Sequence, residues 1–75
     1  MRIVSILENQ KVEKRIAITP DIAKKYIALG FKVTIVENYG EHLGFKDSDY
    51  KNLGVEISTN ESKALNNADI IVQLG

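Results

Sequence analysis

The sequence has no cysteine, a single proline, a single histidine and no excess of either charge. Without cysteine, neither a disulfide framework nor a thiol nucleophile is possible, and we expect an intracellular protein. Ten basic residues balance ten acidic ones without long runs, which argues against a nucleic-acid partner. The first apolar residues reach only Leu7 before Glu8 follows, too few for a signal peptide or a membrane span. These absences predict a soluble, cytoplasmic domain.

The 75 residues are enough for one compact domain with a small core. Residues 2–7 are apolar with little alternation, the pattern of a strand covered on both faces. A helix is expected from Thr19, a good N-cap, with Pro20 at its first position, to a C-terminal cap at Gly30. Its apolar face is predicted to comprise Ile22, Ala23, Tyr26, Ile27 and Leu29.

The rest of the chain continues the alternation of strands and helices. We expect strands at 31–37, 55–58 and 69–74, a short helix from Asp47 that ends at Gly54, and a second at 62–67. Residues 58–61 have the composition of a capping box, and the last strand is apolar enough to be central. The predicted fold is a three-layer α/β domain, Rossmann-like or flavodoxin-like, with helices on both faces of a parallel sheet.

The chain stops at Gly75, directly after the last predicted strand. A complete domain would continue with a loop and a helix that covers this strand, because the bare strand exposes apolar surface and an unpaired edge. We therefore expect residues 1–75 to be an incomplete fragment, the N-terminal part of the first domain of a longer protein.

Arg15 is the candidate binding residue, because it lies between a buried strand and a well-defined helix start, near the rim of the predicted sheet. A guanidinium held there suits a carboxylate or a phosphate, with which it forms two parallel hydrogen bonds. A solvated charge or surface ion pair is the alternative. Glu8 and Glu13 flank the same loop and could orient Arg15 or act as acid and base.

Other polar residues have simpler explanations. The glycines of residues 40–44 lack the spacing of a phosphate-binding loop, so we expect a turn. His42 has no second ligand, cysteine or triad partner in the sequence, which leaves a surface histidine as its expected role. Asp47 and Asp49 are explained by the start of a helix, and we assign no metal.

A series of short motifs resembles, in order and spacing, the N-terminal domain shared by alanine dehydrogenases and the alpha subunit of proton-translocating NAD(P) transhydrogenase. The resemblance spans essentially the whole chain. Its motifs are residues 1–4, Glu8, residues 15–20, residues 30–33, Gly40, residues 44–45, residues 49–50, residues 54–57 and residues 68–72. The Arg-x-Ala-x-Thr-Pro run at 15–20 is the most specific of them.

This resemblance implies a two-domain protein whose second, Rossmann-type domain binds the nicotinamide cofactor, so no cofactor-binding residue is expected in this chain. In alanine dehydrogenases the arginine that matches Arg15 contacts the substrate carboxylate. They also have a Lys-Val-Lys signature at the end of the strand that matches residues 72–75, and its second lysine serves in substrate binding and catalysis. This chain has Gln73, Leu74 and Gly75 there. The resemblance therefore does not predict the usual oxidation of an amino acid for this chain.

The resemblance favours a transhydrogenase, in which hydride passes between NAD(H) and NADP(H) and proton translocation is coupled to it. It implies NAD and NADP as cofactors of the assembly, a homodimer, further transhydrogenase subunits including a membrane component, and a cytoplasmic location peripheral to the inner membrane. Catalytic residues remain unassigned, and the fragment alone is expected to be inactive. The alternatives are an alanine dehydrogenase, which deaminates alanine to pyruvate with NAD, and a non-catalytic α/β module.

Overall fold

The computed structural model describes residues 1–8 and 14–74. Its sheet has four parallel strands in the order β3-β2-β1-β4, with β1 at Arg2–Ser5, β2 at Lys32–Val36, β3 at Glu56–Ser58 and β4 at Ile70–Ile71. The helices are α1 at Pro20–Ala28, α2 at Asp47–Lys51 and α3 at Glu61–Asn66, with a 3-10 turn, η1, at Glu41–Leu43. The predicted α/β fold is confirmed.

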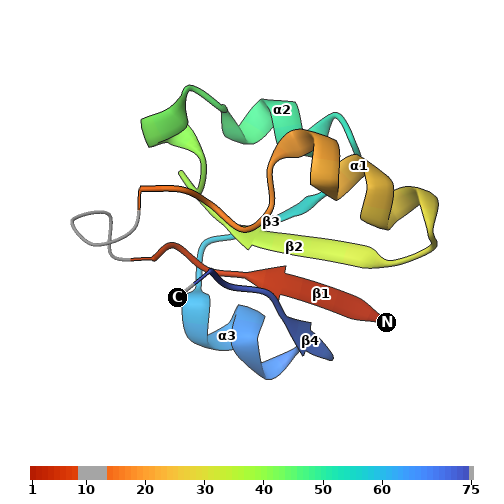
Figure 1. Cartoon of the computed structure of the whole chain (residues 1–75). Coiled ribbons are helices and arrows are strands. Elements are labelled where there is room, and N and C mark those ends of the chain that lie inside the picture. The colour runs from red at the N-terminus through yellow and green to blue at the C-terminus, as the bar shows by residue number, and fades with distance from the viewer. Residues whose placement is uncertain (9–13, 75) are drawn as a thin grey trace.

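Helices cover both faces of the sheet. Figure 1 shows α1 and α2 on one face and α3 on the other. The chain moves outward from β1 to β2 and β3, then returns through α3 to place β4 on the far side of β1. The helices change face where the direction changes, as right-handed crossovers between parallel strands require.

The start of α1 follows the predicted local chemistry. The Thr19 hydroxyl accepts a hydrogen bond from the Ile22 N–H at 3.3 Å, and Pro20 is the first helical residue. Gly30 follows the helix with φ of 94°, a left-handed conformation that glycine adopts without a Cβ clash. Leu29 was predicted on the apolar face and this is wrong: it lies beyond the last helical turn and is 74% exposed.

The cap of α3 differs from the expected capping box. Asn60 is the N-cap, and its side chain accepts from the Lys63 N–H at 2.9 Å, so the helix begins at Glu61. Ser58 is engaged just before the helix, because its hydroxyl bonds to both the backbone N–H and the carbonyl of Asn60. That local turn withdraws Ser58 from the capping role.

The prediction for the last strand is wrong in both its position in the sheet and its length. β4 has two residues, pairs only with β1 among the described strands, and lies at the edge of their sheet, not in its centre. Ile70 and Ile71 are 38% and 54% exposed. The apolar composition of residues 69–74 predicted a longer strand, but side chains take over much of the backbone hydrogen bonding beyond Val72, as described below.

The core lies mainly between the sheet and the α1–α2 layer. Ile3, Val33 and Ile35 supply it from β1 and β2, Ala23 from α1, and Tyr50 from α2. On the opposite face, Val4 of β1 and Thr34 of β2 are buried beneath α3, and Ala64 is the buried residue of α3 itself. Both faces of β1 and β2 are thus covered, which explains their continuous apolar sequence.

Candidate functional site

Arg15 lies on the connection between β1 and α1, at the end of the sheet where β1 terminates, and its side chain is exposed. The three residues after it turn inward: Ile16 and Ala17 are 9% exposed and Ile18 is fully buried. A cation at the surface is therefore carried by a backbone segment that is anchored in the core. The structure agrees with the predicted position of Arg15 at the rim of the sheet, while its role in binding stays a prediction.

Two buried tyrosines hold the backbone of Ile18. The Ile18 N–H donates to the Tyr39 hydroxyl oxygen at 3.1 Å, and the Tyr50 hydroxyl donates to the Ile18 carbonyl at 2.8 Å. The tyrosine rings meet edge to face, with centroids 6.1 Å apart. Both backbone polar groups of Ile18 are satisfied by side chains, which meets the requirement of a buried residue outside regular secondary structure.

Tyr39 continues into a chain of hydrogen bonds at the end of β1. Its hydroxyl lies 2.8 Å from the Ser5 hydroxyl, which in turn lies 2.6 Å from the Gln73 side-chain oxygen and 2.7 Å from the Val72 carbonyl. Because the last two atoms only accept, Ser5 uses its proton for them, and Tyr39 therefore donates to Ser5.

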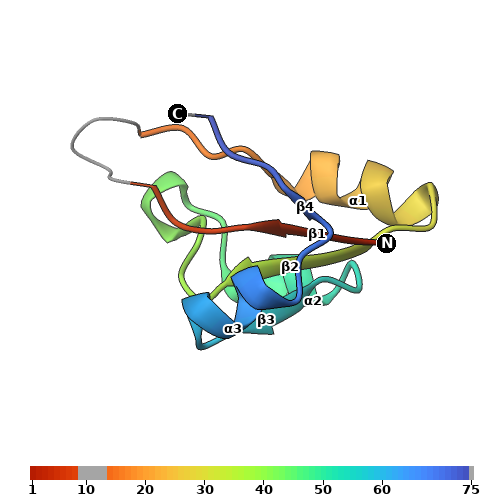
Figure 2. The same ribbon diagram turned by 90° about the horizontal axis from the view of Figure 1, so that it is seen from below.

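Gln73 ties the segment after β4 to β1. Its side-chain oxygen also accepts from the Ile6 N–H at 2.9 Å, so that Ile6 bonds to a side chain where a longer strand would bond to backbone. Glu8 makes the reverse contact, because its carboxylate accepts from the Leu74 N–H at 3.0 Å. We call these two contacts the Gln73–Glu8 clasp. In Figure 2 the segment after β4 runs toward the same end of the sheet as the segment that carries Arg15.

The burial of the tyrosines determines their protonation. Desolvation raises the pKa of Tyr39, although its hydrogen bonding with Ser5 and with the backbone of Ile18 and Ala17 opposes this. Burial likewise raises the pKa of Tyr50, with smaller contributions from Tyr39 and from nearby carboxylates. Both phenols are therefore neutral at physiological pH and able to donate.

His42 lies in η1 and is exposed, and its Nε2 atom is 2.8 Å from the Lys14 carbonyl oxygen. The surrounding glycine loop forms a turn. Gly44 closes it with φ of 87°, and a Cβ on Gly40 would lie 2.9 Å from the Cβ of Phe45, so close packing explains this glycine. The loop makes contact with the segment before Arg15.

The carboxylates of Asp47 and Asp49 bind backbone. Both oxygens of Asp47 accept from the Asn38 N–H, at 3.0 and 3.1 Å, and Asp49 accepts from the Lys46 N–H at 2.8 Å. Within residues 1–8 and 14–74, no three histidine or acidic side chains gather as metal ligands would. Glu13 lies outside the described residues, and so does any pairing of it with Glu8.

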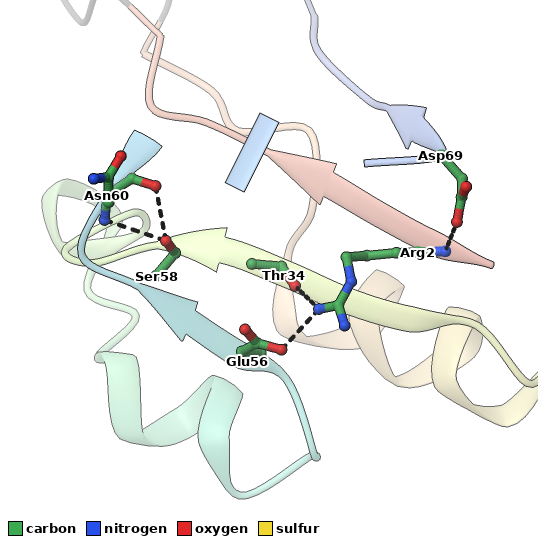
Figure 3. Close-up of polar contacts among 6 residues, drawn as sticks. All are labelled: Arg2, Thr34, Glu56, Ser58, Asn60 and Asp69. Carbon is green, nitrogen blue, oxygen red and sulfur yellow. Dashed lines mark hydrogen bonds and ion pairs between the residues drawn. The ribbon is translucent and has the colours of Figure 1, made fainter. Parts of the chain in front are cut away.

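A polar groove of about 210 Å³ lies between α3 and the sheet, lined among others by Arg2, Thr34, Glu56, Asn60 and Lys63. Figure 3 shows the Arg2 side chain reaching across β2 toward β3. One guanidinium nitrogen of Arg2 binds the Thr34 hydroxyl at 2.8 Å and the Glu56 carboxylate at 2.7 Å.

The backbone N–H of Arg2 bonds to Asp69 at 2.7 Å. The sequence interpretation missed this role, because Arg2 was counted only as part of a strand. The Glu56 carboxylate already neutralises the charge of Arg2. We therefore interpret these contacts as structural, because they connect β1 to β2, to β3 and to Asp69, the residue before β4.

The lysine signature of alanine dehydrogenases has no counterpart in the described part of the chain. Gln73 stands at one of its positions and is committed to Ile6 and Ser5. Gly75, at the position of the second lysine, lies outside the described residues. A lysine ammonium has only donors, so it could not accept from the Ile6 N–H as Gln73 does.

Helices long and apolar enough to cross a membrane are absent from the described ranges 1–8 and 14–74.

Comparison with known proteins shows to which family the chain belongs. Residues 6–75 match the family described as "Alanine dehydrogenase/PNT, N-terminal domain". The chain is 38% identical, over 99% of its length, to a protein of Rickettsia prowazekii (strain Madrid E) that is named as a part of NAD(P) transhydrogenase subunit alpha. It is 28% identical, over 99% of its length, to "Alanine dehydrogenase" of Halomonas elongata (strain ATCC 33173 / DSM 2581 / NBRC 15536 / NCIMB 2198 / 1H9).

A solved structure titled "L-ALANINE DEHYDROGENASE" has a similar fold, with a TM-score of 0.87 and 25% identity over 97% of this chain. The chain spans only a fraction of each of these proteins, namely 19% of the Rickettsia protein, 20% of the Halomonas protein and 20% of the solved structure. These relatives are named as oxidoreductases of the two kinds that the resemblance implied. The chain belongs to the family of alanine dehydrogenase and transhydrogenase N-terminal domains.

Proposed function

We propose that this chain is the N-terminal part of the first domain of an NAD(P) transhydrogenase alpha subunit. In the whole protein, hydride passes between NAD(H), bound by a second domain, and NADP(H), bound by a partner subunit. This transfer is coupled to proton translocation through a membrane component. The assembly contains a homodimer of the alpha subunit and is cytoplasmic, peripheral to the inner membrane. The cofactors perform the chemistry, while the protein binds and orients them.

The observation that most directly supports this proposal is the hydrogen bonding of the Gln73 side chain. An alanine dehydrogenase of the usual kind presents lysine in this region, whereas here the side chain accepts from the Ile6 N–H and from Ser5. A hydride transfer between two nucleotides has no keto acid to bind, and it therefore does not require the lysine. The 38% identity to a transhydrogenase subunit agrees with this choice.

The test uses the full-length protein assembled with its partner subunits. We expect NADPH to reduce an NAD analogue whose reduced form absorbs at a distinct wavelength, and we expect no ammonia-dependent oxidation of NADH by pyruvate. The reverse pattern of activities would identify a dehydrogenase.

Alanine dehydrogenase is the second candidate, favoured by the similarity of fold to the solved L-alanine dehydrogenase and by the presence of Arg15. In either reaction we assign Arg15 as an anion contact, to a carboxylate or a phosphate. Full-length Arg15→Ala should retain nearly normal NAD binding, because the nucleotide belongs to the other domain. Complete loss of NAD binding would contradict this assignment.

A further inference from the structure

We propose that Tyr39, His42 and Tyr50 are positioning residues for Arg15. All three come from the connection after β2 and from α2, and all three bind the backbone on either side of Arg15. The inference rests on the anion-binding role that the proposed function gives to Arg15.

Three hydrogen bonds hold the backbone on the two sides of Arg15, and we call them together the bracket. Before it, the Lys14 carbonyl lies 2.8 Å from Nε2 of His42. After it, the Ile18 N–H binds Tyr39 at 3.1 Å and the Ile18 carbonyl binds Tyr50 at 2.8 Å. A segment without regular secondary structure is thereby fixed at two points, with the guanidinium carried between them.

The two tyrosine contacts of the bracket lie in the core of the molecule, whereas His42 is exposed. Tyr39 and Tyr50 are at most 1% exposed and pack edge to face. Gly40 lets Tyr50 approach, since a Cβ there would lie 3.1 Å from the Tyr50 hydroxyl. Through Ser5, Tyr39 is also linked to the Gln73–Glu8 clasp.

Holding the backbone matters for an exposed arginine. A guanidinium on a mobile loop loses conformational entropy when it binds an anion, whereas a fixed backbone removes part of that loss before binding. The bracket therefore affects how tightly Arg15 binds, while leaving the identity of the anion to other groups. This predicts that weakening the bracket lowers anion affinity even where the fold is intact.

The test is a titration of the intact protein with oxalate, a planar dicarboxylate that suits a guanidinium fork. It is followed by the NMR signal of the Arg15 Nε–H. Arg15→Gln should abolish saturable binding at this site. Tyr39→Phe and His42→Leu should each weaken it about three- to tenfold, the loss expected for one hydrogen bond.

Two further variants separate positioning from stability. Tyr26→Phe is the control, because Tyr26 packs against Phe31 and takes no part in the bracket, so affinity should be unchanged. His42→Gln keeps a donor and should retain most of the affinity that His42→Leu loses. His42 is exposed, so its variants should unfold at the same denaturant concentration as the wild type.

Hydrogen exchange of the Ile18 amide supplies a readout without ligand, and it should accelerate in Tyr39→Phe more than exchange in β1 or β2. Absence of Arg15-dependent oxalate binding in the wild type would overturn the proposal. Wild-type affinity in folded Tyr39→Phe and His42→Leu would overturn it too. Neither result depends on hydride transfer, so the proposed function is judged separately.

Discussion

Single atoms decide much of this structure, and the Tyr50 hydroxyl is the clearest case. It satisfies the buried Ile18 carbonyl. Tyr50→Phe should lower the free energy of unfolding by about 1–3 kcal/mol, because the carbonyl is left buried without a donor. Tyr26→Phe should change it by less than about 0.5 kcal/mol. Urea denaturation of the three proteins measures both, and equal losses in the two variants would contradict this role.

The buried tyrosines Tyr39 and Tyr50 make the stability of the fold depend on pH in the alkaline range. In the unfolded chain they ionise near the ordinary pKa of 10.0, while burial raises the pKa of each in the folded protein. The folded state then holds protons that the unfolded state has lost. Stability is therefore fully present below pH 10 and falls as pH rises above it, by up to about 1.4 kcal/mol per pH unit for each group.

Unfolding measured from about pH 8.5 to about pH 11 tests this dependence, because the range spans the unfolded-state pKa. Tyr50→Phe should show a shallower loss than the wild type over that range, since one of the two raised groups is removed. Parallel curves would mean that Tyr50 ionises equally well in both states.

At the scale of elements, the start of α1 is the most sharply specified feature. Thr19→Ala removes the hydroxyl that accepts from the Ile22 N–H and should lower the free energy of unfolding by about 0.5–2 kcal/mol. Thr19→Ser keeps that oxygen and should lie close to the wild type. Thermal unfolding of the two variants separates the two contributions of Thr19. If the hydroxyl cap dominates, only Thr19→Ala is destabilised. If packing of the methyl group dominates, both variants are destabilised, because both lack it.

Elements with local signals were predictable from the sequence. The Thr19-Pro20 start, the Gly30 end and the apolar strand β1 depend on neighbouring residues, and the structure has them. The helix from Asp47 was expected to end at Gly54, but α2 already ends at Lys51, and Gly54 has the positive φ of the turn that follows. The prediction of β4 was wrong because the length of this strand depends on Gln73 and Glu8. Their hydrogen-bond partners, Ile6 and Leu74, lie 67 and 66 residues away in the sequence. Sequence separation of that size leaves no local pattern.

The candidate site divides in the same way. Arg15 could be singled out from its place before the helix start, while the bracket around it could not. No sequence pattern singles out Tyr39 or Tyr50 for this role, and His42 was expected to be a surface residue. Their hydrogen bonds to Ile18 and Lys14 arise only when the connection after β2 folds back over the connection after β1.

At the scale of the whole molecule, β4 leaves an apolar edge. Ile71 is 54% exposed and Leu74 is 45% exposed, and β4 pairs on one side only among the described strands. The 75-residue chain should therefore self-associate as its concentration rises. Ile71→Lys should reduce this association without unfolding the sheet. Sedimentation of both chains over a concentration series tests it, with the exposed Leu29→Lys as the control for added charge.

The position of β1 has a consequence for the order of events during synthesis. Among the described strands it is the first to leave the ribosome, yet it lies between β2 and β4 in the sheet. Its neighbour β4 and the side chain of Gln73 emerge only after the other described strands. The earliest strand thus stays half-paired until translation has passed Gln73, and its second edge needs protection for all of that time.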